Sequence, residues 1–160
     1  FRSKMPYSFK KDKINAAYAL GEEKHWRGGG LKYMKEAVGW VTGVYIDYAV
    51  SIDFKGFEKL IDALGGIEIY LAKPFEESIQ WSGEGWEEDA HWFKKEIDGE
   101  EKWVFYLPAG QNVLDGKTAL YYVRSRYSTN DFDRMARQQQ VLLALKDKLL
   151  SLGFLANPFK

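Results

Sequence analysis

The chain has 160 residues, of which 46% are hydrophobic and 16% aromatic, a composition that predicts one folded domain with a substantial core. Its 23 basic and 23 acidic residues cancel, so no overall positive field would recruit nucleic acid. The sequence has no cysteine, which excludes disulfides, thiolate metal sites and cysteine nucleophiles. It also has no run of about 18 apolar residues, the length that would predict a membrane-spanning helix.

The first predicted helix covers residues 13–20, with Asp12 as its N-cap and Gly21 as its C-cap. Lys13 would then stand in the first turn, where the helix dipole disfavours a cation. On this chemistry alone, an anion-binding lysine and a solvent-exposed one both remain open. Three consecutive glycines, residues 28–30, indicate a hinge, because the strand–loop–helix context of a phosphate-binding loop is missing.

A helix and then a strand–helix–strand unit are expected next. Residues 31–42 have helical periodicity, and residues 44–54 alternate like a strand. Residues 55–64 are predicted to be a helix and residues 67–71 a second strand, an order that predicts a parallel pair with a right-handed crossover. The fold class is therefore α/β, with a central mixed sheet covered by helices. Three aspartates are scattered over this part in a pattern typical of solvated faces rather than of a metal site: Asp47, Asp53 and Asp62.

Residues 73–107 interrupt this pattern as an expected insertion. Between positions 76 and 101, ten acidic residues stand against two lysines, a net charge of −8. Two alternating stretches, 92–97 and 102–107, flank Asp98–Glu101 and predict a β-hairpin. The tryptophans here could stack on sugar rings in a glycan-contacting arm or, as we favour, pack against the edge of the domain. Four of the chain's six tryptophans lie in this insertion: Trp81, Trp86, Trp92 and Trp103.

The most informative stretch runs from Tyr121 to Gln140. Four of the chain's six arginines lie within it, although lysine outnumbers arginine 17 to 6 overall. Arginine can hold phosphate or carboxylate oxygens with two hydrogen bonds at once. The local preference for arginine therefore indicates a binding site for an oxyanion. The four arginines are Arg124, Arg126, Arg134 and Arg137.

The predicted local structure places the arginines around the start of a helix. Residues 119–123 are expected to be the end of a short helix or strand, which delivers the first two arginines. A turn rich in polar side chains follows, with Asn130 or Asp131 as the N-cap of a long helix over residues 132–152. The apolar stripe of that helix is expected at four leucines: Leu142, Leu145, Leu149 and Leu152.

One face of this long helix would carry binding groups. Asp131, Arg134 and Gln138 are spaced i, i+3 and i+7, so they share a face. A helix N-terminus attracts anions through its free N–H groups and its dipole. Arg124 and Arg126 opposite this end would complete a clamp for a polyanion. We favour this interpretation over a purely structural network of arginines and aspartates.

Other catalytic motifs are incomplete or missing. Residues 116–118 end like a phosphate-binding P-loop, but Gln111 occupies the position of its first glycine. The sequence contains no G-x-S-x-G, and His25 and His91 have no partner motif. A serine-triad hydrolase and a zinc site are therefore both unsupported.

Several stretches of this sequence together resemble one known family. YVRSR is followed by DFDR and RQQ, and LPAGQNVLDGKTAL leads up to it. KINAAYALG and FKGFEKLIDALGGIEI precede these motifs. In content and order they resemble the LytR-CpsA-Psr family over nearly the whole chain. The resemblance implies an α/β/α fold and a Mg2+-dependent phosphotransferase, which moves a glycan polymer from a polyprenyl-pyrophosphate carrier to a cell-wall acceptor such as peptidoglycan.

The resemblance also implies roles for residues of this chain. Arg134 and Asp131 would act in catalysis, Arg134 by neutralising charge during transfer. Asp131 would either orient an arginine or take the proton from the acceptor hydroxyl, and both roles stay open. Mg2+ is expected, although no complete ligand set is visible in the sequence. Five residues are implied in pyrophosphate binding: Lys13, Arg124, Arg126, Arg134 and Gln138. Three apolar residues either wall a tunnel for the lipid tail, as the resemblance implies, or belong to the core as in any domain: Val141, Leu142 and Leu145.

Family members work outside the cytoplasm, held at the cell membrane. Because the chain begins with Phe1 and shows no signal peptide, we expect a preceding N-terminal part with a membrane anchor and further family motifs. Residues 1–160 would then be one domain that lacks its first part. Two other classes stay open: a non-catalytic module that binds a glycan or a lipid carrier, and, against the neutral net charge, a nucleic-acid-binding regulator.

Overall fold

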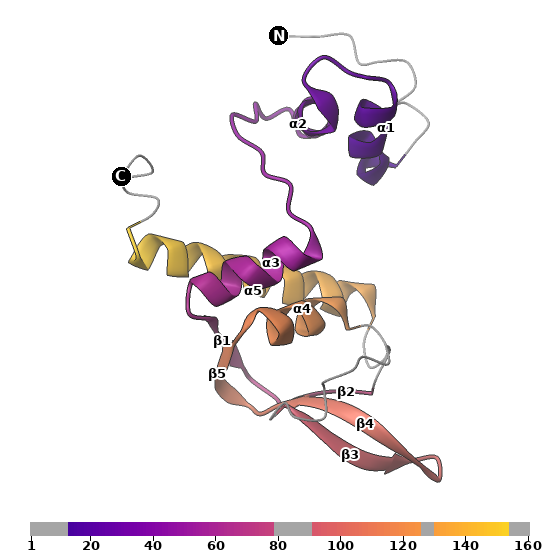
Figure 1. The fold of residues 1–160 in the computed structure, drawn as a ribbon, viewed down its shortest axis with the longest axis vertical. Coiled ribbons are helices and arrows are strands. Elements are labelled where there is room, and N and C mark those ends of the chain that lie inside the picture. Colours follow the sequence, from indigo (N-terminus) through magenta and orange to yellow (C-terminus); the bar gives the residue numbers. More distant parts are fainter. Residues whose placement is uncertain (1–12, 79–90, 126–129, 154–160) are drawn as a thin grey trace. The chain divides into compact units, whose positions relative to one another are not determined.

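The computed structural model describes residues 13–78, 91–125 and 130–153 (Figure 1). The chain divides into two compact units, Phe1–Ile52 and Asp53–Lys160, which are described in turn. The expected single domain with an inserted hairpin remains a prediction. Across the described parts of the chain, none of the helices has both the length and the hydropathy needed to span a membrane.

The first unit is helical. A short 3-10 helix, η2 (Ile14–Ala16), leads into α1 (Ala17–Glu23), and α2 (Gly29–Thr42) packs against α1. The glycine run expected as a hinge instead begins α2, with Gly28 as its N-cap at a φ of 100°, a conformation that favours glycine. Asp12, the expected first N-cap, lies outside the described residues. Three buried residues form the core of this unit: Ala17, Tyr33 and Ala37.

Gly21 does not end the first helix, which corrects the expected C-cap. The helix continues to Glu23, and a Cβ atom on Gly21 would lie 2.6 Å from the Cβ of Tyr33. Across the same contact, the amide of Gly30 donates to Glu22 Oε1 at 2.5 Å. Glycine is therefore required here for the close approach of two helices rather than for a left-handed C-cap.

Residues 44–54 do not form the expected strand. The chain leaves α2 after Thr42 and has no regular structure until α3 begins at Phe54. Side chains on both alternating faces are exposed, among them Tyr45 at 73% and Tyr48 at 92%. A strand requires hydrogen bonds to a neighbour, and no described strand pairs with this segment. The predicted parallel pair with its crossover is therefore wrong.

The strands of the second unit pair antiparallel in two sheets. β1 (Ile67–Leu71), as predicted from the sequence, pairs with β5 (Gly110–Leu114). In the other sheet, β2 (Phe75–Ser78) and β3 (Trp92–Ile97) flank β4 (Glu100–Leu107). The α/β class is confirmed, with antiparallel pairing among the described strands.

The predicted β-hairpin is confirmed, with a tighter turn than expected. Asp98 and Gly99 both have positive φ, 56° and 77°, as a two-residue type I′ turn requires. β4 consequently begins at Glu100, inside the loop expected from the sequence. An ion pair between Lys94 and Glu101, at 2.8 Å, connects the two strands near the turn.

The tryptophans of the hairpin pack against the unit. Trp92 is buried, and its ring centroid lies 4.6 Å from that of Tyr121 in an edge-to-face arrangement. Trp103 is partly buried against the same core. For these two residues the structure supports edge packing over a glycan-stacking arm. Trp81 and Trp86 lie outside the described residues.

Three helices pack together in the second unit: α3 (Phe54–Ala63), α4 (Gly116–Arg124) and α5 (Asp131–Ser151). α4 contacts both α3 and α5, and α5 also contacts β1 (Figure 1). Asp53 caps α3 by accepting a hydrogen bond from the amide of Gly56 at 2.7 Å. The apolar side chains that these helices and strands bury form one core: Ile61, Ile67, Ile69, Leu71, Trp92, Phe105, Leu107, Leu114, Ala119, Tyr121, Tyr122 and Val141.

Candidate functional site

The C-terminal end of α4 carries the first of the expected arginines. Arg124 is the last residue of α4, where its positive charge suits the helix dipole. Its guanidinium group lies over the ring of Phe54, with 4.3 Å between Cζ and the ring centroid. Ser125 then leaves the helix, and its hydroxyl donates to the carbonyl of Tyr121 at 2.8 Å. Arg126 lies outside the described residues.

α5 begins with a capping box. The side-chain oxygen of Asn130 accepts a hydrogen bond from the amide of Asp133 at 3.0 Å, and the Asp133 carboxylate accepts one from the amide of Asn130 at 3.4 Å. Of the two expected N-caps, Asn130 is therefore correct. The helix spans Asp131–Ser151, one residue earlier at each end than predicted.

An ion pair on the expected face of α5 joins Asp131 and Arg134. Arg134 Nη2 lies 3.2 Å from Asp131 Oδ1. The Asp131 side chain is 63% exposed and that of Arg134 28%, so solvent screens the pair. This ion pair is compatible with the first of the two roles left open by the sequence, the orientation of an arginine, which remains a prediction. The action of Asp131 as a proton acceptor also remains a prediction.

Gln138 links this face of α5 to α4. Its Nε2 donates to the carbonyl of Val123, one residue before Arg124, at 3.5 Å. This bond brings the first turns of α5, which carry Arg134, against the end of α4, which carries Arg124, at one place in the fold. We call it the α4–α5 junction and define it as residues 121–125 and 130–140. Pyrophosphate binding at this junction remains a prediction. The expected contribution of Lys13, an exposed residue of the first unit, to pyrophosphate binding also remains a prediction.

Arg137 has a different environment from Arg124 and Arg134, which are partly exposed. It is only 5% exposed, its Nε donates to the carbonyl of Tyr122 at 3.0 Å, and its Nη2 donates to the carbonyl of Ser125. The sequence pattern counts Arg137 among the four clustered arginines, but it predicts no separate role for this residue. The helical spacing could have identified Arg137 as inward-facing. Val141 follows it at i+4 and Leu145 at i+8, and both of these residues pack in the core.

Gln140 is a second connection that the sequence did not predict. Its Nε2 donates to the carbonyl of Tyr70 in β1 at 2.7 Å, and the Tyr122 hydroxyl donates to its Oε1 at 2.9 Å. Burial raises the pKa of Tyr122, and the charge of Arg137 partly opposes this shift. Burial also lowers the pKa of Arg137, while Tyr122 and Glu77 favour its charged form. α5 is thus tied to both α4 and β1 by polar side chains.

The expected apolar stripe of α5 needs a correction. Val141 is 1% exposed and Leu145 is partly buried, whereas Leu142 is 61% exposed. The buried face runs through Arg137 and Val141. Successive residues of a helix are about 100° apart around its axis, so two residues four positions apart lie on nearly the same side. Contact of Val141, Leu142 and Leu145 with a lipid tail remains a prediction.

The described residues contain no group of three or more histidine, aspartate or glutamate side chains that could hold a metal ion. Several aspartates have structural roles instead: Asp53 caps α3, Asp133 belongs to the capping box, and Asp62 accepts a hydrogen bond from the amide of Gly116 at 2.7 Å. The ligands of the expected Mg2+ are thus not identified, and its binding remains a prediction.

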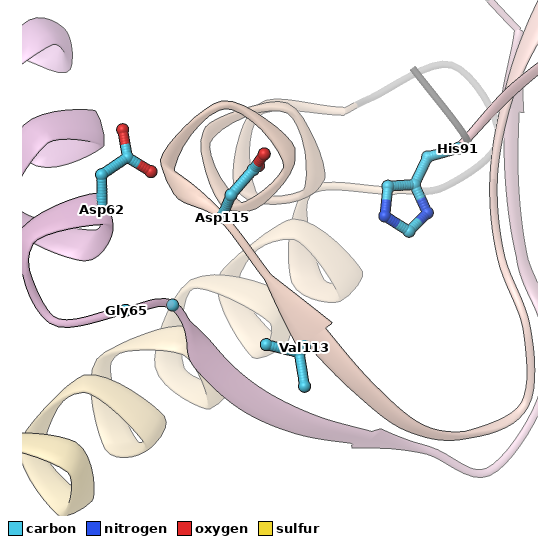
Figure 2. Close-up of a pocket in the computed structure, with 6 residues that line it drawn as sticks. Asp62, Gly65, His91, Val113 and Asp115 are labelled. Atoms are coloured by element: carbon cyan, nitrogen blue, oxygen red, sulfur yellow. The ribbon is translucent and has the colours of Figure 1, made fainter.

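A cavity of about 270 Å3 lies at the other end of α4. Figure 2 shows Asp115 between Asp62 and His91, with Val113 and Gly65 completing the wall. Asp115 Oδ1 caps α4 by accepting a hydrogen bond from the amide of Thr118 in the first turn of the helix. Asp62 accepts its hydrogen bond from the amide of Gly116, the first residue of the same helix. Both carboxylates are therefore used in starting α4, and none of the residues expected to bind pyrophosphate lines the cavity.

Comparisons with known proteins agree on one family. The model of the LytR_cpsA_psr family matches residues 4–159. The chain is 31% identical over 140 residues to the cell wall biosynthesis protein LcpA of Corynebacterium glutamicum, a match that covers 86% of this chain and 23% of LcpA. It is 32% identical over 149 residues to the polyisoprenyl-teichoic acid–peptidoglycan teichoic acid transferase TagV of Bacillus subtilis, a match that covers 92% of this chain and 32% of TagV.

Solved structures agree on the fold. The crystal structure of Bacillus subtilis TagV has a TM-score of 0.55 at 31% identity, over 86% of this chain and 42% of that one. A structure of TagT bound to LI-WTA has a TM-score of 0.55 at 25% identity, over 88% of this chain and 46% of that one. This chain thus spans less than half the length of these relatives. From the family match and these likenesses together, the chain belongs to the LytR-CpsA-Psr family.

Proposed function

We propose that this chain is the carrier-binding part of a transferase, which moves a glycopolymer from a polyprenyl-pyrophosphate carrier to a hydroxyl group of the cell wall. The single observation that supports this most is the α4–α5 junction. There the end of α4, with Arg124, meets the first turns of α5, a helix of 21 residues that carries Arg134 and Gln138. Forked cations beside a helix N-terminus favour a ligand with several negative oxygens, such as a pyrophosphate.

The relatives support the same class of substrate. TagV is named as a transferase of teichoic acid to peptidoglycan, and TagT has a structure with LI-WTA bound. By analogy, this chain would act outside the cytoplasm on a polyprenyl-linked glycan, with peptidoglycan or another wall polymer as the acceptor. A membrane anchor elsewhere in the protein would keep it near the lipid carrier.

In the proposed reaction, the acceptor hydroxyl oxygen attacks the phosphorus atom that carries the glycan. A new phosphorus–oxygen bond forms, the bond to the second phosphate breaks, polyprenyl phosphate leaves, and the hydroxyl proton passes to a base. Phosphoryl transfer of this kind depends mainly on positioning and on stabilising charge. Arg124 and Arg134 would neutralise the phosphate oxygens, while Asp131 would orient Arg134 or take the proton.

Mg2+ belongs to the proposal through the family resemblance alone. When bound, it would neutralise part of the pyrophosphate charge. The part of the chain that the structure describes offers no group of three side chains suited to hold it.

Ligand-dependent thermal stability tests the proposal. Octaprenyl pyrophosphate at a hundred times its dissociation constant should stabilise the wild-type protein by about 2.7 kcal/mol. Arg134→Lys should remove most of this gain, because an ammonium keeps the charge but loses the fork. Its stability without ligand should change little, because the ion pair with Asp131 is solvent-exposed.

The control is Lys146→Arg, a change to an exposed residue of the same helix, which should respond to the ligand like the wild type. An equal loss of stability in Arg134→Lys with and without ligand would mean that the junction is a structural ion-pair network. The absence of any ligand-induced shift in the wild type would contradict the proposed function itself.

A further inference from the structure

The C-terminal end of α4 is held by Arg137. The last carbonyl groups of a helix have no partner inside the helix. Arg137 Nε donates to the carbonyl of Tyr122 at 3.0 Å, and its Nη2 donates to the carbonyl of Ser125. One planar group therefore bridges the last turn of α4 and the residue at which the chain leaves it.

The surroundings of Arg137 restrict the orientation of its guanidinium group. Its Cζ lies 5.0 Å from the ring centroid of Phe75 and 5.8 Å from that of Tyr122. Glu77, which is 1% exposed, is a second buried charge and favours the charged form of Arg137. A buried cation between rings, with a carboxylate and two carbonyls as electrostatic partners, has few alternative positions.

Arg137 also lies between the groups of the proposed binding site. The two carbonyls that it bridges flank Arg124 in the sequence. On α5, Arg137 follows Arg134 by one turn and directly precedes Gln138. Arg137 is thus one of three side-chain links between the end of α4 and the first turns of α5, beside those of Gln138 to Val123 and of Tyr122 to Gln140, and it is the buried one that donates two hydrogen bonds.

We propose that Arg137 is a positioning residue, which acts through the backbone of α4 rather than by touching a ligand. By bridging two carbonyl groups, it holds Arg124 at the distance from Arg134 that an anionic ligand requires. This inference rests on the proposed function. Misplacing a binding group by about 1 Å can cost about 100-fold in rate, so a residue with this task matters without contacting the substrate.

Three variants of the full-length protein test this role. Arg137→Lys keeps a positive charge but cannot bridge two carbonyls with a planar fork. Phe75→Leu keeps the guanidinium group but removes the ring against which it packs, and it carries the test if Arg137→Lys does not fold. Ile67→Val, a buried change in β1 outside the α4–α5 junction, controls for a general loss of stability.

Two quantities are measured, each at the same interval below the melting temperature of the variant. Amide hydrogen exchange at Ser125, whose N–H donates to the carbonyl of Tyr121 at 3.0 Å, reports on the end of α4. The affinity for octaprenyl pyrophosphate reports on the binding site. We expect Arg137→Lys to accelerate the exchange and to weaken binding about tenfold, or by about 1.4 kcal/mol. Phe75→Leu should change both in the same direction by a smaller factor, and Ile67→Val should change neither.

The two measurements separate this inference from the proposed function. If the wild type does not bind octaprenyl pyrophosphate, the proposed function fails, while exchange at Ser125 still decides whether Arg137 orders the end of α4. If the wild type binds and Arg137→Lys behaves like Ile67→Val, the positioning role is overturned and the proposed function stands. Weaker binding without faster exchange also overturns it, because Arg137 would then act on the ligand directly.

Discussion

The two ends of α4 are completed by side chains of opposite charge. At its start, two carboxylates, those of Asp115 and Asp62, accept hydrogen bonds from the first amide groups of the helix. At its end, the guanidinium group of Arg137 donates to two carbonyl groups. Both arrangements agree with the helix dipole, which favours acids at the start of a helix and bases at its end.

The difference between the two ends lies in burial. Asp115 and Asp62 are exposed, and their charges remain hydrated while they cap the helix. Arg137 is buried, so water cannot replace it as a hydrogen-bond donor to the two carbonyl groups. The start of α4 is therefore capped by exposed carboxylates, that of Asp115 beside it in the sequence and that of Asp62 from α3, whereas the end of α4 depends on a buried side chain. Arg124 and Arg134 are both partly exposed.

Arg137→Met should be the most damaging single change at either end. It leaves the carbonyls of Tyr122 and Ser125 without this donor and removes the positive charge beside Glu77. Breaking a buried charged interaction by removing one partner typically costs about 3–5 kcal/mol. The free energy of unfolding from urea denaturation measures this.

The control for that prediction is Arg134→Met, which removes a partly exposed ion pair and should cost at most about 1 kcal/mol. If both arginine variants lost the same small amount of stability, burial would not distinguish the two arginines. The contrast between the ends of α4 would then be wrong.

Asp115→Ala should have a smaller effect. It removes the side chain that accepts from the amide of Thr118 at 2.8 Å, and losing such an N-cap costs about 0.5–2 kcal/mol. Asp115→Asn should keep most of this stability, because asparagine caps helices about as well. Urea denaturation of both variants gives the comparison. A loss for Asp115→Ala as large as that for Arg137→Met would contradict the contrast in burial between the two ends of α4.

Alkaline pH should act mainly on the end of α4, through Tyr122. Burial raises its pKa above the ordinary value of 10.0, so the folded state holds this proton more tightly than the unfolded state. The corresponding stabilisation is present below about pH 10 and is lost as the pH rises through the pKa of the folded state.

Tyr122→Phe should therefore show a shallower loss of stability above pH 10 than the wild type. At neutral pH the same variant should lose about 1 kcal/mol, because its hydrogen bond to Gln140 is missing. Denaturation curves at several pH values measure both effects, with Tyr18→Phe, a change to an exposed tyrosine, as the control. Equal slopes for wild type and Tyr122→Phe would mean that burial does not affect this group.

Elements with local signals were predicted well. α5 was expected over residues 132–152 and spans Asp131–Ser151, because Asn130 and Asp133 satisfy each other within one turn. The β-hairpin depends on Asp98 and Gly99, which suit a turn with positive φ. In each case the partners that decide the structure lie only a few residues apart.

Alternation alone did not decide where strands form. Residues 44–54 and β1 both alternate, yet only β1 has a partner among the described strands, β5. The pattern tells which side chains share a face, but a strand also needs a neighbour that supplies hydrogen bonds. For β1 that neighbour lies about forty residues away in the sequence, beyond the reach of any local signal.

Two features could be predicted from the sequence: four arginines lie within twenty residues around the start of a helix, and Asp131, Arg134 and Gln138 share a face of that helix. Which of the two arginines on α5 is buried could be read only from the folded chain. Arg134 and Arg137 are about 60° apart around the axis of α5, from the geometry of 3.6 residues per turn. Arg137 is buried because Phe75 and Tyr122, from a strand and another helix, pack on its side of α5. The charge of a residue is encoded at its own position, whereas its burial depends on partners that only folding brings close.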